Sequence, residues 1–523
     1  MGSQLHAQLN EYYRVDYEHN VHPPQGESLP LGSAIEEYIQ SNLNTTKEEL
    51  SRLPILSPSE WDDSHPLTHY FVSSSHNTYL LSRQLVGRAS AESYTHALSR
   101  GARCVEIDVW PSSSSEGLVV THGYTLTKGV SFRKVCEAIG EGVDALGPDA
   151  WPVLVSLECH VGPKGQQNMV NILKSAWGEK LVVGRLQNDD SHDQEDDNVI
   201  VSPRYSKGKI ILMVEYYPPN NFAQIEAEEE VEEQIDEIDP ILEHFSAESI
   251  IEGEDLPQVL IGEVERGKIS DELAALGYYA RSWKPSMGWL QQELVDPRHI
   301  LINISETNIL SLLPTQLDPL IQHARLHLRR IFPKGTRIRS SNMDILKFWR
   351  NGSHVVSLNW QTVDTSMQIN EAMFVDSPGW VLKPNAQRML DQELRKFKLS
   401  AEIVGLSSLI LPKGRQDKTC NVYVEAELYH NLQDQKWKSK TVATTEDGDV
   451  MWNENLVWEF DRDELAFIRL RVRENRRLEK DLDLAMFCAR VDHLQQGWRL
   501  AYLLNMDGRA SGATLLVNFE LTQ

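Results

Sequence analysis

The chain has 523 residues, of which 41% are hydrophobic and 24% charged, a globular composition too long for one ordinary core, so we expect two or three domains. Its net charge of −25 is concentrated in two acidic segments, residues 187–198 and 226–255, neither of which contains Lys or Arg. A chain without a basic excess is not expected to bind nucleic acid, and one without an apolar run of about 18 residues is not expected to span a membrane.

The N-terminus and the cysteines indicate the cellular compartment. No signal-peptide pattern follows Met1, and His6 stands where a myristoylation signal requires Ser or Thr. The five cysteines are scattered and form no C-x-x-C pair, which argues against a disulfide framework or a structural zinc site. We therefore expect a soluble protein in the reducing cytoplasm.

The first half of the chain alternates between strand and helix patterns. Residues 1–65 are polar, with one expected helix at 34–53 and no calcium-binding helix–loop–helix pattern. From 66 to 216, short apolar runs alternate with helical stretches, which is typical of βα units in a parallel sheet. We expect strands at 70–74, 104–110, 118–122, 153–158 and 209–216, and helices at 91–100, 132–146 and 166–181.

The second half resumes this alternation and then changes character. The acidic segment 217–256 is expected to be a solvated linker, and a long surface insert of this kind costs a barrel little loop entropy. From 257 to 390 we expect strands at 276–283, 300–305 and 355–362 and a helix at 314–330. From 398 to 523, strand-like runs follow one another with polar turns and little helix, which predicts an antiparallel β-sandwich.

Polar side chains gather at the ends of the expected strands. Glu106 and Asp108 are two residues apart, so both carboxylates face the same side of a strand. Asn77 and Glu158 also follow apolar runs, and parallel barrels build their sites at the C-terminal strand ends. Four hard oxygen donors suit Ca²⁺ or Mg²⁺ better than zinc.

Two histidines complete this constellation. His76 and His122 would be available for proton transfer beside a metal held by the oxygen donors. The six residues together predict a metal-assisted phosphoester reaction. The alternative interpretation is that they are ordinary polar strand ends, because clustered titratable groups mark sites only statistically.

The motifs around these residues resemble the eukaryotic phosphoinositide-specific phospholipases C. The first half is similar to their X region in S-S-S-H-N-T-Y-L at 73–80, R-C-V-E-I-D-V-W at 103–110, T-H-G-Y-T at 121–125 and S-L-E at 156–158. The second half is similar to their Y region in R-R-I-F-P-K-G at 329–335, S-S-N at 340–342, S-L-N-W-Q-T at 357–362 and G-W-V-L-K-P at 379–384. Residues 399–523 resemble the C2 domain that follows.

The resemblance implies an α/β fold, a split (β/α)8 TIM barrel, followed by an all-β C2-type sandwich. Its X half would span 66–216 and its Y half 257–390, joined by the acidic linker. The implied activity is calcium-dependent cleavage of phosphatidylinositol or its phosphates into diacylglycerol and an inositol phosphate. The implied partner is a phosphoinositide in a membrane, bound peripherally at the cytoplasmic face by a monomer.

The family's catalytic residues carry over to matching positions. The resemblance assigns His76 to stabilising the pentacoordinate phosphorus and His122 to protonating the diacylglycerol oxygen. It implies that Glu106 or Glu158 takes the proton of the attacking inositol 2-hydroxyl, giving a cyclic phosphodiester that water opens. Its calcium ligands match Asn77, Glu106, Asp108 and Glu158. Arg103 matches an arginine close to the metal, with a structural ion pair as the alternative interpretation.

This sequence departs from the family where the ring phosphates are bound. The family uses two lysines, a serine, an arginine and a stacking tyrosine, and the matching positions here hold Met213, Glu215, Asn303, Arg330 and Phe332. Phe332 retains an aromatic face, but a carboxylate at Glu215 would repel a phosphate. We therefore expect a preference for phosphatidylinositol or its 4-monophosphate. The alternative is that Lys207, Lys209 or another base takes the place of the lysines.

The remaining segments allow fewer conclusions. The sandwich offers only Asp417 in its first loop region, 413–421, and mixed charges in 473–481, so we expect calcium-independent packing, with weak contact to anionic lipid as the less favoured role. The acidic linker is interpreted as a tether, or as an autoinhibitory plug over a cationic mouth.

Two other functions are alternatives to a phospholipase C. One is a phosphoinositide-binding scaffold without turnover, and the other is a secreted calcium-independent phospholipase of bacterial type. The retained histidines and the four calcium-ligand positions argue against the scaffold. The acidic ligand set and the C-terminal sandwich argue against the bacterial type.

Overall fold

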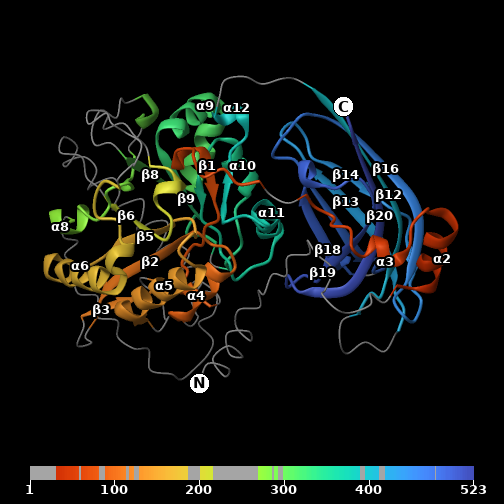
Figure 1. Cartoon of the computed structure of the whole chain (residues 1–523), viewed down its shortest axis with the longest axis horizontal. Helices are drawn as coiled ribbons and strands as arrows, with labels where there is room; N and C mark the ends of the chain where they lie inside the picture. Colours follow the sequence, from red (N-terminus) through yellow and green to blue (C-terminus); the bar gives the residue numbers. More distant parts are fainter. Residues whose placement is uncertain are drawn as a thin grey trace. The chain divides into compact units, whose positions relative to one another are not determined.

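The computed structural model describes residues 31–57, 60–81, 89–112, 117–122, 129–186, 201–215, 269–285, 288–291, 299–337, 339–388, 395–411, 418–477 and 479–523. They form two compact units (Figure 1). Among the described residues, the first contains those of 61–364 and 377–383, and the second contains those of 31–60, 365–376 and 384–523. Both acidic segments, and the expected linker 217–256, lie outside the described residues.

The first unit is a barrel of parallel strands, as expected. Each strand pairs in parallel with its neighbour in the order β2, β5, β6, β7, β8, β9, β10, β1, and a parallel bridge between Ser74 and Cys104 closes β1 onto β2. These strands are β1 (Tyr70–Val72), β2 (Cys104–Pro111), β5 (Val153–Cys159), β6 (Ile210–Glu215), β7 (Arg281–Trp283), β8 (Ile300–Ser305), β9 (Leu328–Phe332) and β10 (Val355–Val356).

Three antiparallel strands extend the barrel sheet at its two ends. β11 (Trp380–Leu382) pairs with β1, and β3 (Leu118–Val120) and β4 (Val130–Ser131) continue outward from β2. The run at 118–122 was expected to be one of the alternating strands of a largely parallel sheet, and it is instead an antiparallel strand between β2 and β4. This difference matters for the site, because an antiparallel strand returns the chain to the end of β2 where Asp108 lies.

Helices follow the strands along the chain. Among the described residues they are α4 (Glu92–Ser99), α5 (Phe132–Leu146), α6 (Pro163–Trp177), α8 (Asp271–Ala274), α9 (Glu306–Leu326) and α10 (Ile345–Arg350). The prediction for α5 is confirmed, and Ser131 caps it by accepting a hydrogen bond from the backbone of Lys134.

The helix expected at 314–330 was placed too late. It begins at Glu306, where Ser305 is the N-cap, and Pro314 lies inside it rather than at its start. It ends at Leu326, so that Arg330 belongs to β9 instead of the helix. A strand side chain points into or out of the barrel, and this correction is what brings Arg330 inside.

The barrel interior is apolar at one end and polar at the other. Alternate residues of each strand face inward, and the lower layer is packed by buried side chains from every strand. Toward the C-terminal ends the inward positions become polar, as in Glu106 and Asp108 on β2 or Asn303 on β8. The lower layer includes Val72, Cys104, Leu154, Ile211, Met213, Ala280, Leu301, Leu328 and Val355.

The second unit is the expected β-sandwich. Its antiparallel strands are β12 (Lys396–Ser407), β13 (Asn421–Tyr429), β14 (Gln435–Lys438), β15 (Val442–Ala443), β16 (Val450–Asp461), β17 (Phe467–Glu474), β18 (Leu482–Arg490), β19 (Gly497–Leu504) and β20 (Ala510–Thr522). Its core includes the buried rings of Trp452, Trp458 and Phe519.

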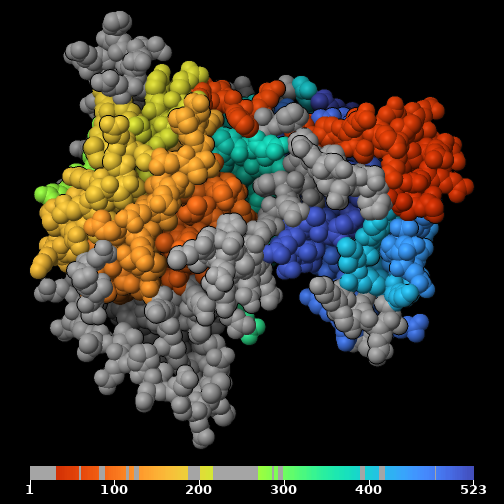
Figure 2. Space-filling model, turned by 60° about the horizontal axis from the view of Figure 1, so that its bottom comes forward, coloured from red at the N-terminus to blue at the C-terminus, as the bar shows by residue number. Residues whose placement is uncertain are grey.

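Segments from elsewhere in the chain complete the second unit. The single helix expected at 34–53 is two helices, α2 (Ser33–Asn42) and α3 (Lys47–Leu50), because Thr46 starts a new helix with a capping box. Ile35, Ile39 and Leu50 pack on sandwich residues. Figure 1 shows α2 and α3 beside the strands of this unit, and Figure 2 shows their red surface next to its blue surface. The N-terminal segment is therefore part of the sandwich unit, as are α11 (Thr365–Phe374) and α12 (Asn385–Arg388).

Two further observations concern the cysteines and the helices. In the part of the chain that the structure describes, no disulfide joins any of the five cysteines. Within the described residues, no helix combines the length and the apolar character that crossing a bilayer requires.

Candidate active site

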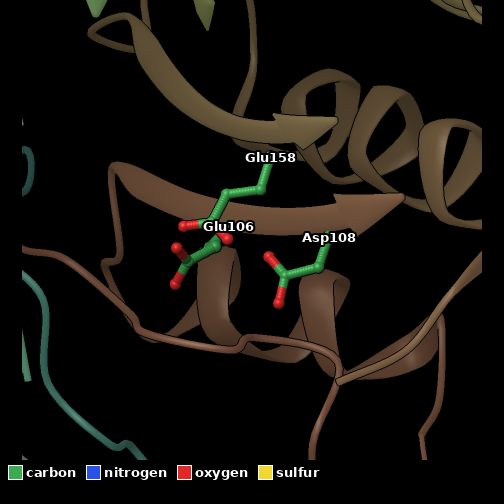
Figure 3. Close-up of side chains that lie close together, drawn as sticks. All are labelled: Glu106, Asp108 and Glu158. Atoms are coloured by element: carbon green, nitrogen blue, oxygen red, sulfur yellow. The ribbon is translucent and has the colours of Figure 1, made fainter. Parts of the chain in front are cut away.

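Three carboxylates meet at the C-terminal ends of two neighbouring strands (Figure 3). Glu106 and Asp108 come from β2, and the strand register places Asp108 opposite Glu158 of β5. One oxygen of each lies within 4.8 Å of the others. Glu106 and Asp108 are buried, whereas the Glu158 side chain is 35% exposed, so the cluster opens toward solvent on the β5 side.

The surroundings of these carboxyls shift the pKa values of two of them in opposite directions. Burial, together with the charges of Glu158 and Glu106, raises the pKa of Asp108 well above its ordinary value. Desolvation alone would raise the pKa of Glu158, but the nearby imidazole of His160, with further help from Lys284, lowers it. His160 Nε2 lies 3.7 Å from Glu158 Oε2, and its ring stacks on Trp110 with centroids 4.0 Å apart.

A buried arginine partly compensates this negative charge. Arg330 of β9 forms an ion pair with Glu106, and both side chains are nearly inaccessible to solvent. Nη1 of Arg330 donates a hydrogen bond to Asn303 Oδ1 at 3.1 Å. The charge of Glu106 raises the pKa of Arg330 although burial opposes the change, so the guanidinium is a permanent cation in the barrel. Phe332 stands beside it, 5.9 Å from ring centroid to guanidinium carbon.

Asn77 is held next to the carboxylates by its backbone and by Tyr79. Its φ of 44° lies in the left-handed region, which Asn tolerates better than most residues. In this conformation its N–H donates to Glu106 Oε2 at 2.9 Å. The Tyr79 hydroxyl lies 3.0 Å from Asn77 Oδ1 and 2.5 Å from Asp108 Oδ2, and therefore links the amide to the acidic cluster.

His76 is oriented by an asparagine from the other half of the barrel. Its Nδ1 lies 2.9 Å from Asn359 Oδ1, and Asn359 Nδ2 donates to the carbonyl of Ser341 at 3.2 Å, which fixes the amide orientation. Nδ1 therefore carries the hydrogen, and Nε2 faces Glu106 at 4.0 Å. Burial lowers the pKa of His76.

His122 follows β3 and lies close to the same strand ends. The register places Val120 opposite Val109, and the N–H of Thr121 donates to the Asp108 carbonyl at 3.3 Å. His122 is the next residue and is partly buried. The structure therefore brings both predicted histidines to the strand ends that carry the carboxylates.

The chemistry of the cluster fits a hard divalent cation. Three carboxylates and the amide oxygen of Asn77 supply oxygen donors only. Within the described residues, Asp108 Oδ1 is buried and has no hydrogen-bond partner, an arrangement that costs free energy unless a cation binds there. Asn77, Glu106, Asp108 and Glu158 would hold such an ion.

The positions that depart from the family lie on β6. Met213 is 1% exposed and packs in the lower layer of the barrel, level with Ser156. Glu215 ends the strand on the same face and forms an ion pair with Lys284, at 3.8 Å from Nζ to Oε1. The carboxylate at this rim is thus matched by a lysine that follows the next strand.

Lys207 and Lys209 do not reach this rim. Both precede Ile210, where β6 begins, so about six residues of extended strand, roughly 20 Å, separate them from the level of Glu215. Lys207 pairs with Asp63 at 2.8 Å, and Lys209 donates to the Glu179 carbonyl at 2.9 Å. The alternative in which either of them replaces the missing lysines has no support in the structure.

Arg103 lies on the other face of β2. It is an odd number of residues away from Glu106 and Asp108 along the chain, so it faces the opposite side. Its guanidinium donates to the carbonyls of Leu98 and Ala102 at 3.1 and 2.8 Å. The structure therefore does not bring Arg103 into the acidic cluster. Its contacts are structural, which was the alternative interpretation, although its partners are carbonyls instead of an acid.

Four further residues shape the site and were not predicted. Tyr79 and Asn359 lie within motifs that the sequence displays, and His160 is two residues after the S-L-E motif, so these three positions carried a signal. Lys284 carried none, because its partnership with Glu215 joins strands that the long insert separates in sequence.

The second loop region of the sandwich is internally paired. Asp481 accepts hydrogen bonds from the Tyr423 hydroxyl at 2.6 Å and from the Arg476 N–H at 3.1 Å. Arg476 also pairs with Glu474 and Glu479. Asp417, of the first loop region, lies outside the described residues.

The barrel, with its acidic cluster at the C-terminal strand ends, and the β-sandwich unit correspond to three known protein domains. The family "Phosphatidylinositol-specific phospholipase C, X domain" matches residues 63–216, its Y domain matches 273–386, and the C2 domain matches 398–504. The chain belongs to the phosphatidylinositol-specific phospholipase C family.

Curated relatives and solved structures share this organisation. The chain is 28% identical to 1-phosphatidylinositol 4,5-bisphosphate phosphodiesterase delta-4 of Xenopus laevis, over 88% of this chain and 61% of the relative. It is 27% identical to 1-phosphatidylinositol 4,5-bisphosphate phosphodiesterase 1 of Candida albicans, over 91% of this chain and 48% of the relative. The chain thus spans between about half and three fifths of these two relatives. The crystal structure of L. pealei PLC21 aligns with a TM-score of 0.72 at 22% identity, over 99% of this chain and 68% of that one, which shows the shared fold.

Proposed function

We propose that this chain is a calcium-dependent phosphoinositide phospholipase C that releases diacylglycerol and an inositol phosphate through a cyclic phosphodiester. The observation that carries the proposal is the cluster of Glu106, Asp108 and Glu158, flanked by His76 and His122. One Asp108 oxygen in it has no hydrogen-bond partner among the residues that the structure describes. The family membership and the names of the relatives, which cleave phosphatidylinositol 4,5-bisphosphate, support the same reaction class.

The chain's own residues would divide the chemistry between them. A bound Ca²⁺ would lower the pKa of the inositol 2-hydroxyl and offset charge on the phosphate. Glu106 or Glu158 would accept the hydroxyl proton as the 2-oxygen attacks phosphorus. His122 would give a proton to the diacylglycerol oxygen as the bond from phosphorus to that oxygen breaks.

The second half of the reaction would reverse the proton transfers. Water would open the cyclic phosphodiester with His122 as the base. His76, held by Asn359 with Nε2 toward Glu106, would stabilise charge on the phosphoryl oxygens as the imidazolium, whose Nε2 can donate a hydrogen bond. Burial opposes this form and the charge of Glu106 favours it. Arg330 would bind the headgroup beside Asn303, and Phe332 would stack on the inositol ring.

The substrate preference should follow from β6. With Met213 in the core and a carboxylate at Glu215, no lysine extends from this strand at the level where the family binds two ring phosphates. We therefore propose that phosphatidylinositol and its 4-monophosphate are preferred over the 4,5-bisphosphate. The lipid would be reached by peripheral binding to a cytoplasmic membrane face, with the C2-type sandwich acting without calcium.

Headgroup release from the three lipids in mixed micelles, with calcium and with chelator, tests the proposal. We expect calcium-dependent release that His76→Ala and His122→Ala abolish, with a cyclic inositol phosphate detectable among the products. Absence of release from every lipid by a folded protein would contradict the proposal and favour a binding scaffold. Equal turnover of the bisphosphate would contradict the proposed preference alone.

A further inference from the structure

The rim of the barrel carries a lysine, Lys284, that lies outside the motifs by which this sequence resembles the family. Lys284 directly follows β7, and Ser282, two residues earlier, pairs in register with Glu215. Residues two apart in an extended chain share a face, so Lys284 faces the same interior as Glu215, one step nearer the C-terminal end. Its Nζ lies 3.8 Å from Glu215 Oε1.

Lys284 forms an arc with two residues of the next strands. Ser282 pairs with Leu301, and Asn303 pairs with Arg330, so Lys284, Asn303 and Arg330 occupy equivalent inward positions on or just after three consecutive strands. Arg330 and Asn303 are already joined by a hydrogen bond of 3.1 Å. Two cations around one amide make a site for an oxyanion.

The pair of Lys284 and Glu215 is accessible to a headgroup. Their side chains are 27% and 20% exposed, whereas Arg330 is almost fully buried beneath the rim. The charge of Lys284 also lowers the pKa of Glu158, which places Lys284 within electrostatic reach of the acidic cluster. A phosphate on a headgroup whose phosphodiester lies at that cluster would meet Lys284 at the open side.

We infer that Lys284 is the residue that binds a single ring phosphate of the headgroup, together with Arg330, and that Glu215 excludes a second. The inference rests on the proposed phosphodiesterase function and deepens it by naming the substrate class, a phosphoinositide with one ring phosphomonoester. The ammonium of Lys284 and the guanidinium of Arg330 would both face this phosphate, and Glu215 and Glu106 already offset part of their charge. A second phosphate on the neighbouring ring carbon would approach the Glu215 carboxylate and be repelled.

The test compares ratios of kcat/KM among phosphatidylinositol, its 4-phosphate and its 4,5-bisphosphate in mixed micelles. We expect the wild type to prefer the 4-phosphate over both other lipids. Lys284→Met should lower the ratio of 4-phosphate to phosphatidylinositol about tenfold, the usual effect of losing one charged hydrogen bond. Glu215→Gln should raise the ratio of bisphosphate to 4-phosphate by a similar factor.

Two variants serve as controls. Lys207→Met removes the same type of side chain at the opposite end of β6, where Lys207 pairs with Asp63, and should keep the wild-type ranking. Lys284→Arg keeps the positive charge and should restore most of the preference that Lys284→Met loses. Circular dichroism of each variant establishes that the ranking, and not folding, has changed.

A measurement without turnover separates this inference from the proposed function. Calorimetry of inositol 1,4-bisphosphate and inositol 1-phosphate should show that Lys284→Met weakens binding of the first about tenfold more than binding of the second. If the wild type hydrolyses no lipid, the proposed function fails, and calorimetry still decides whether Lys284 binds the phosphate. If it hydrolyses lipid with the same ranking in Lys284→Met, or without preference for the 4-phosphate, the inference is wrong.

Discussion

Charged residues two apart on neighbouring strands occur in both units of this protein, with opposite outcomes. In the barrel, Glu106 and Asp108 stand beside Glu158. Burial and these like charges raise the pKa of Asp108, whereas His160 and Lys284 lower that of Glu158. In the sandwich, Arg469 and Arg471 of β17 stand opposite Glu427 and Glu425 of β13, and each finds an acidic partner. The same alternation therefore makes a binding site where one sign dominates and a structural ladder where the signs match.

The largest difference between the two regions should be seen in catalysis. His76→Ala removes the imidazole beside Glu106, and we expect activity to fall by about 10²–10⁴-fold, the usual contribution of such a group. His430→Ala, which removes a histidine from the sandwich, is the matched control and should retain activity. Headgroup release at saturating calcium measures both, and comparable losses in the two variants would contradict the assignment.

Removing a carboxylate from the ladder should destabilise the sandwich. Glu427 is buried and pairs with Arg469 at 2.9 Å, so Glu427→Gln leaves the buried guanidinium without its anion. We expect a loss of about 3 kcal/mol in the free energy of unfolding, measured by denaturant titration. Lys436→Met removes the 66% exposed partner of the same carboxylate and should cost less than about 1 kcal/mol.

The same ladder predicts a dependence of stability on pH. Although burial opposes the change, Lys436, Arg471 and Arg469 lower the pKa of Glu427 from 4.5 to about 2. A lowered pKa in the folded state gives stability that is present above pH 4.5 and is lost as pH falls toward 2. Glu427→Gln should lack this acid-sensitive part, and a sandwich that loses stability with the same slope in both proteins would contradict the prediction.

The barrel should respond to the same kind of substitution with the opposite sign. Asp108→Asn keeps an acceptor for the Tyr79 hydroxyl but removes one of three repelling charges. In chelator we expect the variant to be about 1 kcal/mol more stable than the wild type, measured by calorimetric melting. Calcium should reverse this order, because only the wild type gains stability from binding the ion tightly. A variant destabilised under both conditions would show that the carboxylate is structural.

The smallest effect is expected on the solvent side of the sandwich. Lys418 and Glu446 form an ion pair at 3.2 Å, but their side chains are 75% and 71% exposed. Lys418→Met should therefore change the free energy of unfolding by less than about 0.5 kcal/mol. A larger change in a thermal melt would mean that exposure does not separate structural pairs from incidental ones in this protein.

Much of the fold was predictable because its signals are local. The apolar runs indicated β2, β5, β6 and β8, and the helical stretch at 132–146 is α5. The helix before β9 was misplaced because a proline inside a helix was taken for its start. The N-terminal helices were not assigned to the sandwich, since an amphipathic helix does not indicate which surface covers its apolar face.

The site was predictable to the extent that its residues lie at strand ends within short motifs. Sequence spacing indicated that Glu106 and Asp108 share a face, and the strand register brings Glu158 to them. The ion pairs of Arg330 with Glu106 and of Lys284 with Glu215 join residues far apart in the chain, and no spacing rule reaches that far. The side of the site proposed to bind the ring phosphate was therefore the part that the sequence predicted least.

The two halves of the barrel meet between β6 and β7, which the long insert separates in sequence. These two strands pair in parallel, so hydrogen bonds join the halves in addition to the chain itself. Cleavage anywhere in 216–268 would leave one fragment with the three carboxylates and the other with Arg330 and Asn359. Neither fragment alone holds a complete site, so activity would report their reassociation. The protein could thus serve as a split reporter, in which two fused partners bring the fragments together and lipid cleavage becomes the signal.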